Sequence, residues 1–196
     1  ILETIPCDVV AMSGGWSPVV HLWSHCGGKL TWDTAQAAFK PDVDKAPTGA
    51  DGKAFVTAAG SASGALLLAD VLSDADAAGQ AAATATGHKT GRNASAAPEA
   101  SHTPEAPMAP VWLMPHGAGI KLRSKAWLDY QNDVKVSDVQ LAAQEGFHSV
   151  EHAKRYTTLG MATDQGKLSN INGLAILSDS LNQPIPQTGT TTFRPP

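Results

Sequence analysis

The sequence reads Ala54-Phe55-Val56-Thr57-Ala58-Ala59-Gly60-Ser61-Ala62-Ser63-Gly64 in its first half, an apolar run that passes into a glycine-rich turn. An Ala-rich stretch covers residues 65–85 directly afterwards. Five of its apolar residues have helix-compatible spacings, namely Leu66, Ala69, Val71, Leu72 and Ala75. We therefore predict a strand over residues 54–59, a turn and a helix, which together are the βα unit of an α/β domain.

An earlier apolar run, residues 7–12, predicts a second buried strand, which the Gly and Pro residues of the next six positions end. Ligands of α/β domains lie outside the carboxyl ends of strands, and glycine lets a cofactor approach the backbone closely. The candidate cofactor-binding residues at this strand end are Ser13, Gly14, Gly15 and Trp16. A tight turn without a ligand would have the same local sequence.

The turn at residues 60–64 is a second candidate, because amide groups before a helix can bind a pyrophosphate or a ribose. Gly60, Ser61 and Gly64 are its candidate cofactor-binding residues. The full dinucleotide fingerprint is G-x-G-x-x-G, whereas this segment has G-x-x-x-G. Close packing of a helix on a strand explains these glycines equally well.

The second half of the chain predicts a linker and then a small helical module. Residues 88–110 are rich in Ala, Ser, Thr, Glu and Pro, which indicates an extended linker. Residues 125–134 can hold one short strand. Three helices are then predicted: the first begins at a capping box of Ser137 and Gln140 and ends at Gly146, the second begins at Ser149, and the third begins at Ser169 and ends before Pro184.

Two motifs resemble known sites without meeting their requirements. Residues 160–169 suggest a P-loop, but five residues separate the glycines and Leu168 follows Lys167. A Gly-Lys step before a helix can still hold a phosphate. His21, His25 and Cys26 suggest a metal, but a structural zinc needs a second ligand pair, so packing or surface roles are preferred.

Composition narrows the class of protein. A net charge of -4 over 196 residues argues against a nucleic-acid-binding protein. No apolar run reaches the length of a membrane span, and two cysteines make no disulfide framework. We therefore expect a soluble, cytoplasmic protein without nucleic-acid or membrane partners.

Two blocks together resemble the α subunits of heterotetrameric sarcosine oxidases: residues 7–22, CDVVAMSGGWSPVVHL, and residues 149–167, SVEHAKRYTTLGMATDQGK. The tail, GTTTFRPP at 189–196, is similar to the point where that family enters its aminomethyltransferase-like domain. The resemblance, and a first residue that is not Met, imply an internal segment. Its expected parts are the end of an FAD/NAD(P)-binding-like domain (1–87), a Pro/Ala-rich linker (88–115), a helical domain (116–186) and the start of the folate-binding domain (187–196).

The helical domain resembles the [2Fe-2S] domain of bacterioferritin-associated ferredoxin (BFD) type. The cysteines of that family would fall at Asp129, Gln131, Asp164 and Ser169, none of which is cysteine here. Because such clusters need thiolate ligands, the resemblance predicts the fold without an iron–sulfur cluster, and no metal site is expected.

The resemblance implies oxidative demethylation of sarcosine to glycine, with O2 reduced to H2O2 and the one-carbon unit passed to tetrahydrofolate. NAD would bind this subunit at the turns of Gly14-Gly15 and Gly60-Ser61. FMN would lie at the interface with the β subunit, FAD in the β subunit, and γ and δ subunits would complete the enzyme. The residues expected to face FMN are Thr157, Thr158, Gln165 and Lys167.

No catalytic residue is expected in this segment, and the segment alone is expected to be inactive. Two alternatives remain: the α subunit of a related opine or amine oxidase or dehydrogenase, and a non-catalytic binding module. The tail at residues 190–196 favours the sarcosine enzyme.

Overall fold

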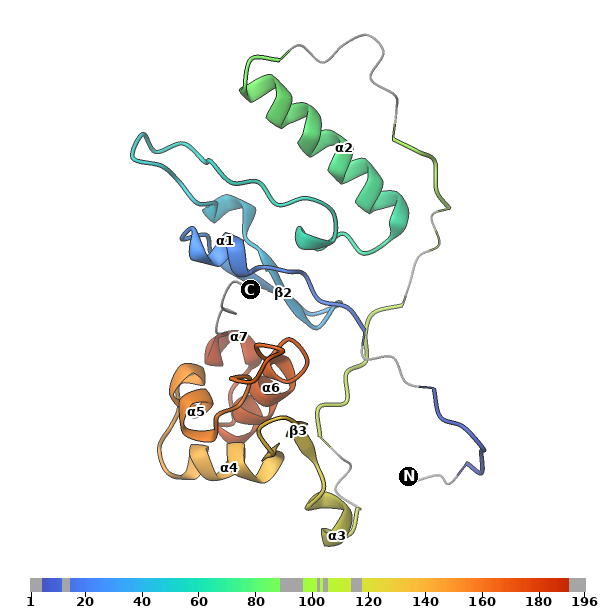
Figure 1. Ribbon diagram of the computed structural model, residues 1–196, viewed down its shortest axis with the longest axis vertical. Helices are drawn as coiled ribbons and strands as arrows, with labels where there is room; N and C mark the ends of the chain where they lie inside the picture. Colours follow the sequence, from blue (N-terminus) through green and yellow to red (C-terminus); the bar gives the residue numbers. More distant parts are fainter. Residues whose placement is uncertain are drawn as a thin grey trace. The chain divides into compact units, whose positions relative to one another are not determined.

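The computed structural model describes residues 5–11, 15–88, 97–101, 103, 106–113 and 118–190. The chain forms two compact units, one of residues 15–109 and the other of residues 1–14 and 110–194 (Figure 1). Both units mix helices with short strands, so the chain has a mixed α/β structure. None of the helices in the described ranges is both long and apolar enough to cross a membrane.

The first unit is built around a β-hairpin of β1 (Leu30–Asp33) and β2 (Ala38–Pro41), which pair antiparallel. Trp32 lies opposite Phe39, and their rings meet edge to face with centroids 5.0 Å apart, an arrangement that stabilises cross-strand pairs. Trp23 of α1 (His21–His25) is buried and donates its Nε1 hydrogen to the carbonyl of Lys29, 2.7 Å away. This bond fastens α1 to the residue that precedes the hairpin.

The long helix α2 (Leu68–Ala85) confirms the helix predicted over residues 65–85. Ala69, Val71 and Leu72 are half-buried, while Ala75 is exposed. Two short 3-10 helices, η1 (Val43–Lys45) and η2 (Gly60–Ala62), occupy the segment between β2 and α2. Among the described positions in residues 97–109, none is helix or strand.

Both predicted strands of the α/β unit are wrong. The described part of the first, residues 7–11, is exposed and has no strand, because no described segment offers it a ladder partner. In the second, residues 54–59, only Ala54 pairs, in an isolated bridge to Thr48. Pro47 precedes Thr48 and has no N–H to donate, so this ladder stops after Phe55 donates to the Pro47 carbonyl.

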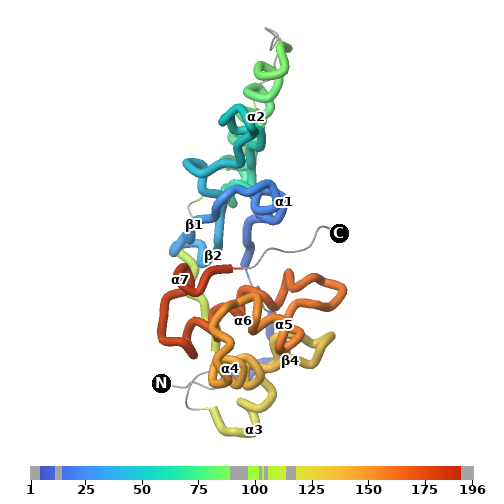
Figure 2. Tube along the Cα trace, turned by 90° about the vertical axis from the view of Figure 1, so that its left-hand side faces the viewer, coloured from blue at the N-terminus to red at the C-terminus, as the bar shows by residue number. Residues whose placement is uncertain are grey.

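The second unit contains the antiparallel hairpin β3 (Trp127–Asp129) and β4 (Val134–Lys135), which confirms a short strand within residues 125–134. Its main helices are α4 (Val136–Gln144), α5 (Val150–Thr157) and α6 (Asn170–Ser180), with short helices α3 (Ile120–Arg123) and α7 (Ile185–Thr188) beside them. Figure 2 shows α4, α5 and α6 grouped in this unit. The core consists of Val134, Val136, Val139, Ala142, Ala143, Ala153, Leu159, Ile176 and Leu177.

The helix boundaries agree with the sequence signals at most ends. Ser149 and Ser169 occupy the N-cap positions of α5 and α6, but neither side chain makes a capping hydrogen bond. Gly146, with φ +92°, follows the end of α4. The capping box of Ser137 and Gln140 is wrong, because α4 begins at Val136. Asp138 caps it instead, by accepting a hydrogen bond of 2.8 Å from the backbone N–H of Lys135.

The two hairpins have the same turn, which the sequence did not indicate as a repeat. In the first, Asp33 Oδ1 accepts from the backbone N–H groups of Ala35 and Gln36, and Ala37 has φ +49°. In the second, Asp129 Oδ1 accepts from Gln131 and Asn132 in the same way, and Asp133 has φ +54°. Such Asx turns reverse the chain without a glycine, so the usual hairpin signals are absent.

Lys40→Met is expected to raise the pKa of Asp33. Lys40 Nζ lies 2.7 Å from Asp33 Oδ2, and this hydrogen bond lowers the pKa of Asp33 from its ordinary value. A carboxyl with a lowered folded-state pKa stabilises the fold above its unfolded pKa, and this contribution is lost as the pH falls through the folded-state pKa. NMR titration of the Asp33 carboxyl in both proteins measures the shift.

The matched control is Lys45→Met, because Lys45 pairs with Asp42 rather than Asp33. It should leave the Asp33 titration unchanged. An Asp33 pKa that is equal in wild type and Lys40→Met would contradict the assignment.

Candidate cofactor-binding surface

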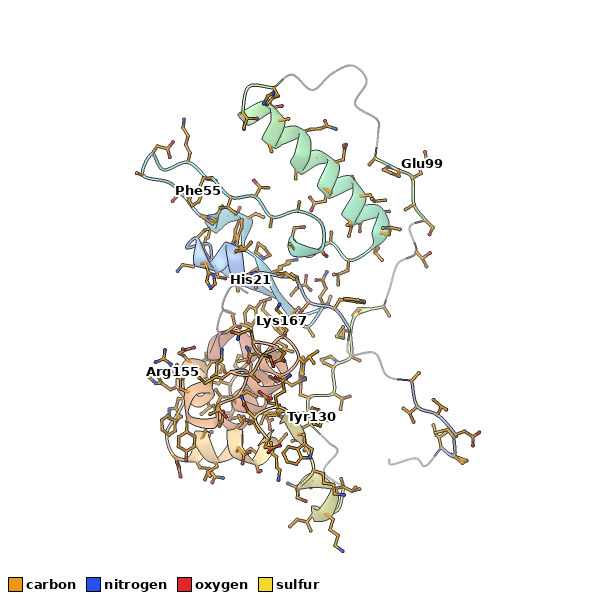
Figure 3. The ribbon with its side chains drawn as sticks, in the orientation of Figure 1. His21, Phe55, Glu99, Tyr130, Arg155 and Lys167 are labelled. Carbon is orange, nitrogen blue, oxygen red and sulfur yellow. The ribbon has the colours of Figure 1, made fainter. Side chains whose placement is uncertain are left out.

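The predicted FMN-facing residues lie in one loop of the second unit, residues 157–169, between α5 and α6 (Figure 3). The loop begins where Thr158, with φ +62°, ends α5. Thr157 Oγ1 donates to the Ala153 carbonyl at 2.8 Å and accepts from the Leu159 N–H at 3.2 Å. The two threonines therefore fix the loop's first turn, since Thr158 Oγ1 also donates internally, to the Thr157 carbonyl.

The β3–β4 turn holds the loop from the other side. Asp129, only 4% exposed, accepts a hydrogen bond of 3.0 Å from the backbone N–H of Gly160 through Oδ2. Gln131 Oε1 accepts from both the N–H and the hydroxyl of Thr163. Asn132 Nδ2 donates to the Thr158 carbonyl at 3.0 Å. Three neighbouring side chains of one turn thus bind three points along the loop.

Asn170, the first residue of α6, closes the loop. Its side chain packs against both Gly160 and Gly166, which have φ +65° and +75°. A Cβ at either glycine would collide with the Asn170 side chain, so both the dihedral angles and the space require glycine. Asn170 therefore makes the loop a compact structure rather than an open connection.

The four positions where the resemblance placed cluster cysteines have structural roles in this loop. Asp129 and Gln131 bind it as described above, and Asp164 Oδ1 accepts from the Gly166 N–H at 3.2 Å. Ser169 is 1% exposed, and its hydroxyl has no hydrogen-bond partner among the described residues. These side chains occupy the positions with polar and hydrogen-bonding groups that are poor ligands for an iron–sulfur cluster.

Lys167 is the residue of this loop that is best placed to meet a ligand. It is exposed, and no hydrogen bond or ion pair joins its ammonium group to another residue of the described part of the chain. Gln165 is half-buried, has φ +55°, and donates from Nε2 to the Ala162 carbonyl at 3.3 Å. Lys167 therefore offers free donors, whereas the donors of Thr157 and Thr158 are already used.

The end of α5 that leads into this loop is held against the end of α4. The rings of Phe147 and Tyr156 stack with centroids 4.5 Å apart. A hydrogen bond to Glu145 raises the pKa of the Tyr156 hydroxyl, because it favours the protonated phenol. This contact fixes the helix that carries Thr157.

Of the residues predicted to meet NAD, Gly15, Trp16 and the turn at residues 60–64 lie in the first unit. Side chains of that unit occupy part of the space beside these glycines. Ser13 and Gly14 lie outside the described residues. Gly15 has φ +77°, and the Met108 side chain occupies the place of a Cβ there, while Trp16 is 79% exposed. The structure thus explains Gly15 by close packing with Met108, and leaves the Trp16 ring open to a ligand.

The turn at residues 60–64 is held by a carboxylate that sequence reasoning missed. Asp74 of α2 accepts from the Gly60 N–H and from the Ser63 hydroxyl, both at 2.7 Å. The N–H groups of Ser63, Gly64 and Ala65 donate to carbonyls within the same turn. Ser61 remains exposed.

The residues considered as metal ligands, His21, His25 and Cys26, do not form a metal site. His21 and His25 lie edge to face with centroids 6.3 Å apart, and Cys26 is exposed. Across the described ranges, no group of three or more His, Cys, Asp or Glu residues is placed to hold a metal ion.

Comparison with known proteins finds similarity to one domain family in the C-terminal part of the chain and to one subunit along the whole chain. Residues 123–196 match the sarcosine oxidase A3 domain. The chain is 42% identical over 193 residues to sarcosine oxidase subunit alpha of Rhizobium meliloti (strain 1021), covering 98% of this chain and 18% of that protein. It is 40% identical over 197 residues to the alpha subunit from Corynebacterium sp. (strain P-1), covering 99% and 19%.

The chain thus spans about a fifth of the length of the curated relatives it matches. A second corynebacterial alpha subunit, from strain U-96, is 41% identical over 197 residues, again along 99% of this chain. The similarity therefore runs through both units and through the loop at residues 157–169. From these matches, residues 123–196 are similar to the sarcosine oxidase A3 domain, and the chain as a whole is similar to a part of sarcosine oxidase subunit alpha.

Proposed function

We propose that this chain works as part of the α subunit of a sarcosine oxidase and supplies cofactor-contacting surfaces to it. The observation that carries the proposal is 40–42% identity to three such subunits along nearly the whole chain. The proposed reaction is oxidative demethylation of sarcosine to glycine, with O2 as acceptor, H2O2 as product and tetrahydrofolate as one-carbon acceptor. The β, γ and δ subunits are the proposed partners, and the cytoplasm is the proposed location.

The loop at residues 157–169 is the proposed FMN-facing surface. Its fit to a phosphate rests on Lys167, which is exposed and without an ion pair to any residue in the described ranges. A lysine ammonium can bind a phosphate as a compact charge with three donors. Thr157, Thr158 and Gln165 support it by holding the backbone on either side.

FMN bound at this surface would supply the redox chemistry, and the residues of this chain would bind and orient it. The Gly160 backbone is held by Asp129, and Thr163 is held by Gln131, so the loop can present Lys167 without first becoming ordered. A preordered site loses less conformational entropy on binding. This is the specific contribution that we assign to the turn between β3 and β4.

NAD is proposed to bind the first unit through Trp16 and Ser61. The exposed indole of Trp16 can stack on a nicotinamide or adenine ring. The Asp74 carboxylate already bonds the Gly60 N–H, so it disfavours a pyrophosphate at that atom, and Ser61 is the more accessible donor. FAD is proposed for the β subunit and no iron–sulfur cluster for this chain, since the four relevant positions lack thiols.

Lys167→Met in the full α subunit, assembled with its partner subunits, tests the FMN assignment. Loss of a charge-assisted hydrogen bond of about 1.5–3 kcal/mol should weaken the affinity for FMN by at least about tenfold. Sarcosine-dependent H2O2 formation should fall in parallel with the bound FMN. The measurements are flavin content per assembled enzyme, the visible flavin spectrum and peroxide production.

Arg155→Met is the matched control. Arg155 is an exposed cation of the neighbouring helix α5, it pairs with Glu151, and it is labelled with Lys167 in Figure 3. Its substitution should leave flavin content and activity unchanged. Equal flavin content in both variants would refute the role of Lys167, and an assembled wild-type enzyme without sarcosine-dependent peroxide would refute the proposed function.

A further inference from the structure

A concave site lies in the second unit, outside the loop at residues 157–169. It is a cleft of about 340 Å³ between α3, the strand β4 and the first turn of α4. Its volume falls at the lower end of the range of about 300–1,000 Å³ that is typical of small-molecule sites. None of its lining residues belongs to the cofactor-binding surface described above, so it needs a separate explanation.

The charged groups of this cleft are cations. Arg123 and Lys135 both line it, and no Asp or Glu is among its lining residues. Lys135 Nζ lies 4.4 Å from the centre of the Trp127 ring, which holds the ammonium by a cation–π contact and uses none of its N–H donors. Arg123 is exposed and has no ion pair with another residue that the structure describes. Both cations therefore keep donors for a ligand.

The carboxylate beside the cleft forms no ion pair with Arg123 or Lys135 in the described part of the chain. Asp138, in the first turn of α4, accepts the backbone N–H of Lys135 at 2.8 Å, so it caps the helix. The Ser124 hydroxyl donates to the Lys121 carbonyl at 3.0 Å and has no proton left for a ligand. Ser137 and Gln140 are the remaining polar side chains of the lining.

The rest of the lining is apolar. Leu113, Ile120, Ala126 and Val136 contribute hydrocarbon surface. Ile120 is 82% exposed. A ligand that covered Ile120 would remove its apolar surface from water, which favours binding.

We infer that this cleft binds a small amphipathic carboxylate, with its head group on Arg123 and Lys135 and its apolar body on Ile120 and Val136. A carboxylate suits the site because the planar guanidinium of Arg123 can bind both oxygens in a bidentate arrangement. The inference does not depend on the proposed function, since it uses neither the loop at residues 157–169 nor any cofactor.

The experiment uses the 196-residue chain and 2-naphthoate, which combines one carboxylate with a compact apolar body. We expect one binding site by isothermal titration calorimetry. Arg123→Ala should weaken binding at least tenfold, whereas Lys121→Ala should leave it within twofold of wild type. Lys121 is the matched control, because it is an exposed cation of the same helix and does not line the cleft.

The neutral analogue 2-naphthalenemethanol distinguishes binding that depends on the carboxylate from binding that depends only on apolar contact. It should bind at least tenfold more weakly than 2-naphthoate, and the affinity for 2-naphthoate should fall as salt is raised. Equal affinity for the acid and the alcohol would overturn the inference, as would the absence of saturable binding. Equal effects of the Arg123 and Lys121 substitutions would also overturn it.

Discussion

Asp129→Ala is expected to destabilise the second unit by about 3–5 kcal/mol, because three backbone N–H groups lose their acceptor. The carboxylate accepts from Gln131 and Asn132 in its own turn and from Gly160 in the distant loop. The Gly160 N–H is buried, so leaving it without an acceptor costs the full desolvation of that group, whereas the N–H groups of Gln131 and Asn132 are only partly buried and lose less. Urea unfolding, followed by NMR resonances of residues in α4 and α6, measures the change for this unit alone.

Two control variants make the Asp129 result specific. Asp129→Asn keeps an acceptor oxygen and should recover part of the lost stability. Asp133→Asn changes an exposed carboxyl of the same turn, at φ +54°, where asparagine is well tolerated. It should cost less than about 0.5 kcal/mol. If Asp129→Ala were no more destabilising than Asp133→Asn, the turn would not hold the loop as described.

Ile176→Ala should lower the free energy of unfolding of the same unit by about 2–5 kcal/mol, the usual cost of truncating a fully buried aliphatic side chain. Ile176 is 1% exposed in the middle of α6 and belongs to the core that joins α4, α5 and α6. The truncation removes three carbon atoms that the surrounding helices cannot replace without moving. The same unit-specific urea titration provides the measurement.

Leu168→Ala is the matched control for the core prediction. Leu168 precedes α6, is 79% exposed and is similar in size to Ile176. Its truncation should cost less than about 0.5 kcal/mol, since little of its surface is buried by the fold. Comparable losses in the two variants would contradict the placement of Ile176 in the core of the unit.

The sequence showed which residues carry hydrogen-bond donors suited to a cofactor. It did not show which of these donors are free in the folded protein. Lys167 after Gly166 indicated a phosphate-binding step, and the structure leaves that ammonium unpaired among the described residues. The hydroxyls of Thr157 and Thr158 looked equally suitable, yet each donates to a carbonyl of its own turn. Local sequence cannot tell these cases apart, because the competing acceptors are set by backbone conformation.

Asp129, Asn170 and Asp74 were missed as the residues that position the two candidate surfaces. Each contacts a segment that is distant along the chain, or glycines whose positive φ angles cannot be predicted from the sequence. Asp129 reaches Gly160, and Asn170 fills the space that two glycines with positive φ leave open. An isolated Asp or Asn has no pattern that reveals such a partner, so only the folded structure identifies it.

The sequence alone located the four longest helices, α2, α4, α5 and α6, to within a few residues at their ends. Spacing of apolar residues, Ser at N-caps and glycine beyond a C-terminus are local signals, and helices satisfy their hydrogen bonds locally. Strands depend on partners elsewhere, so residues 7–11 and 54–59 remained unpaired or nearly so despite apolar, β-branched sequences. Tertiary structure decided which donors stay free, because that depends on contacts such as Asp129 with Gly160 and Asp74 with Gly60 that bring distant segments together.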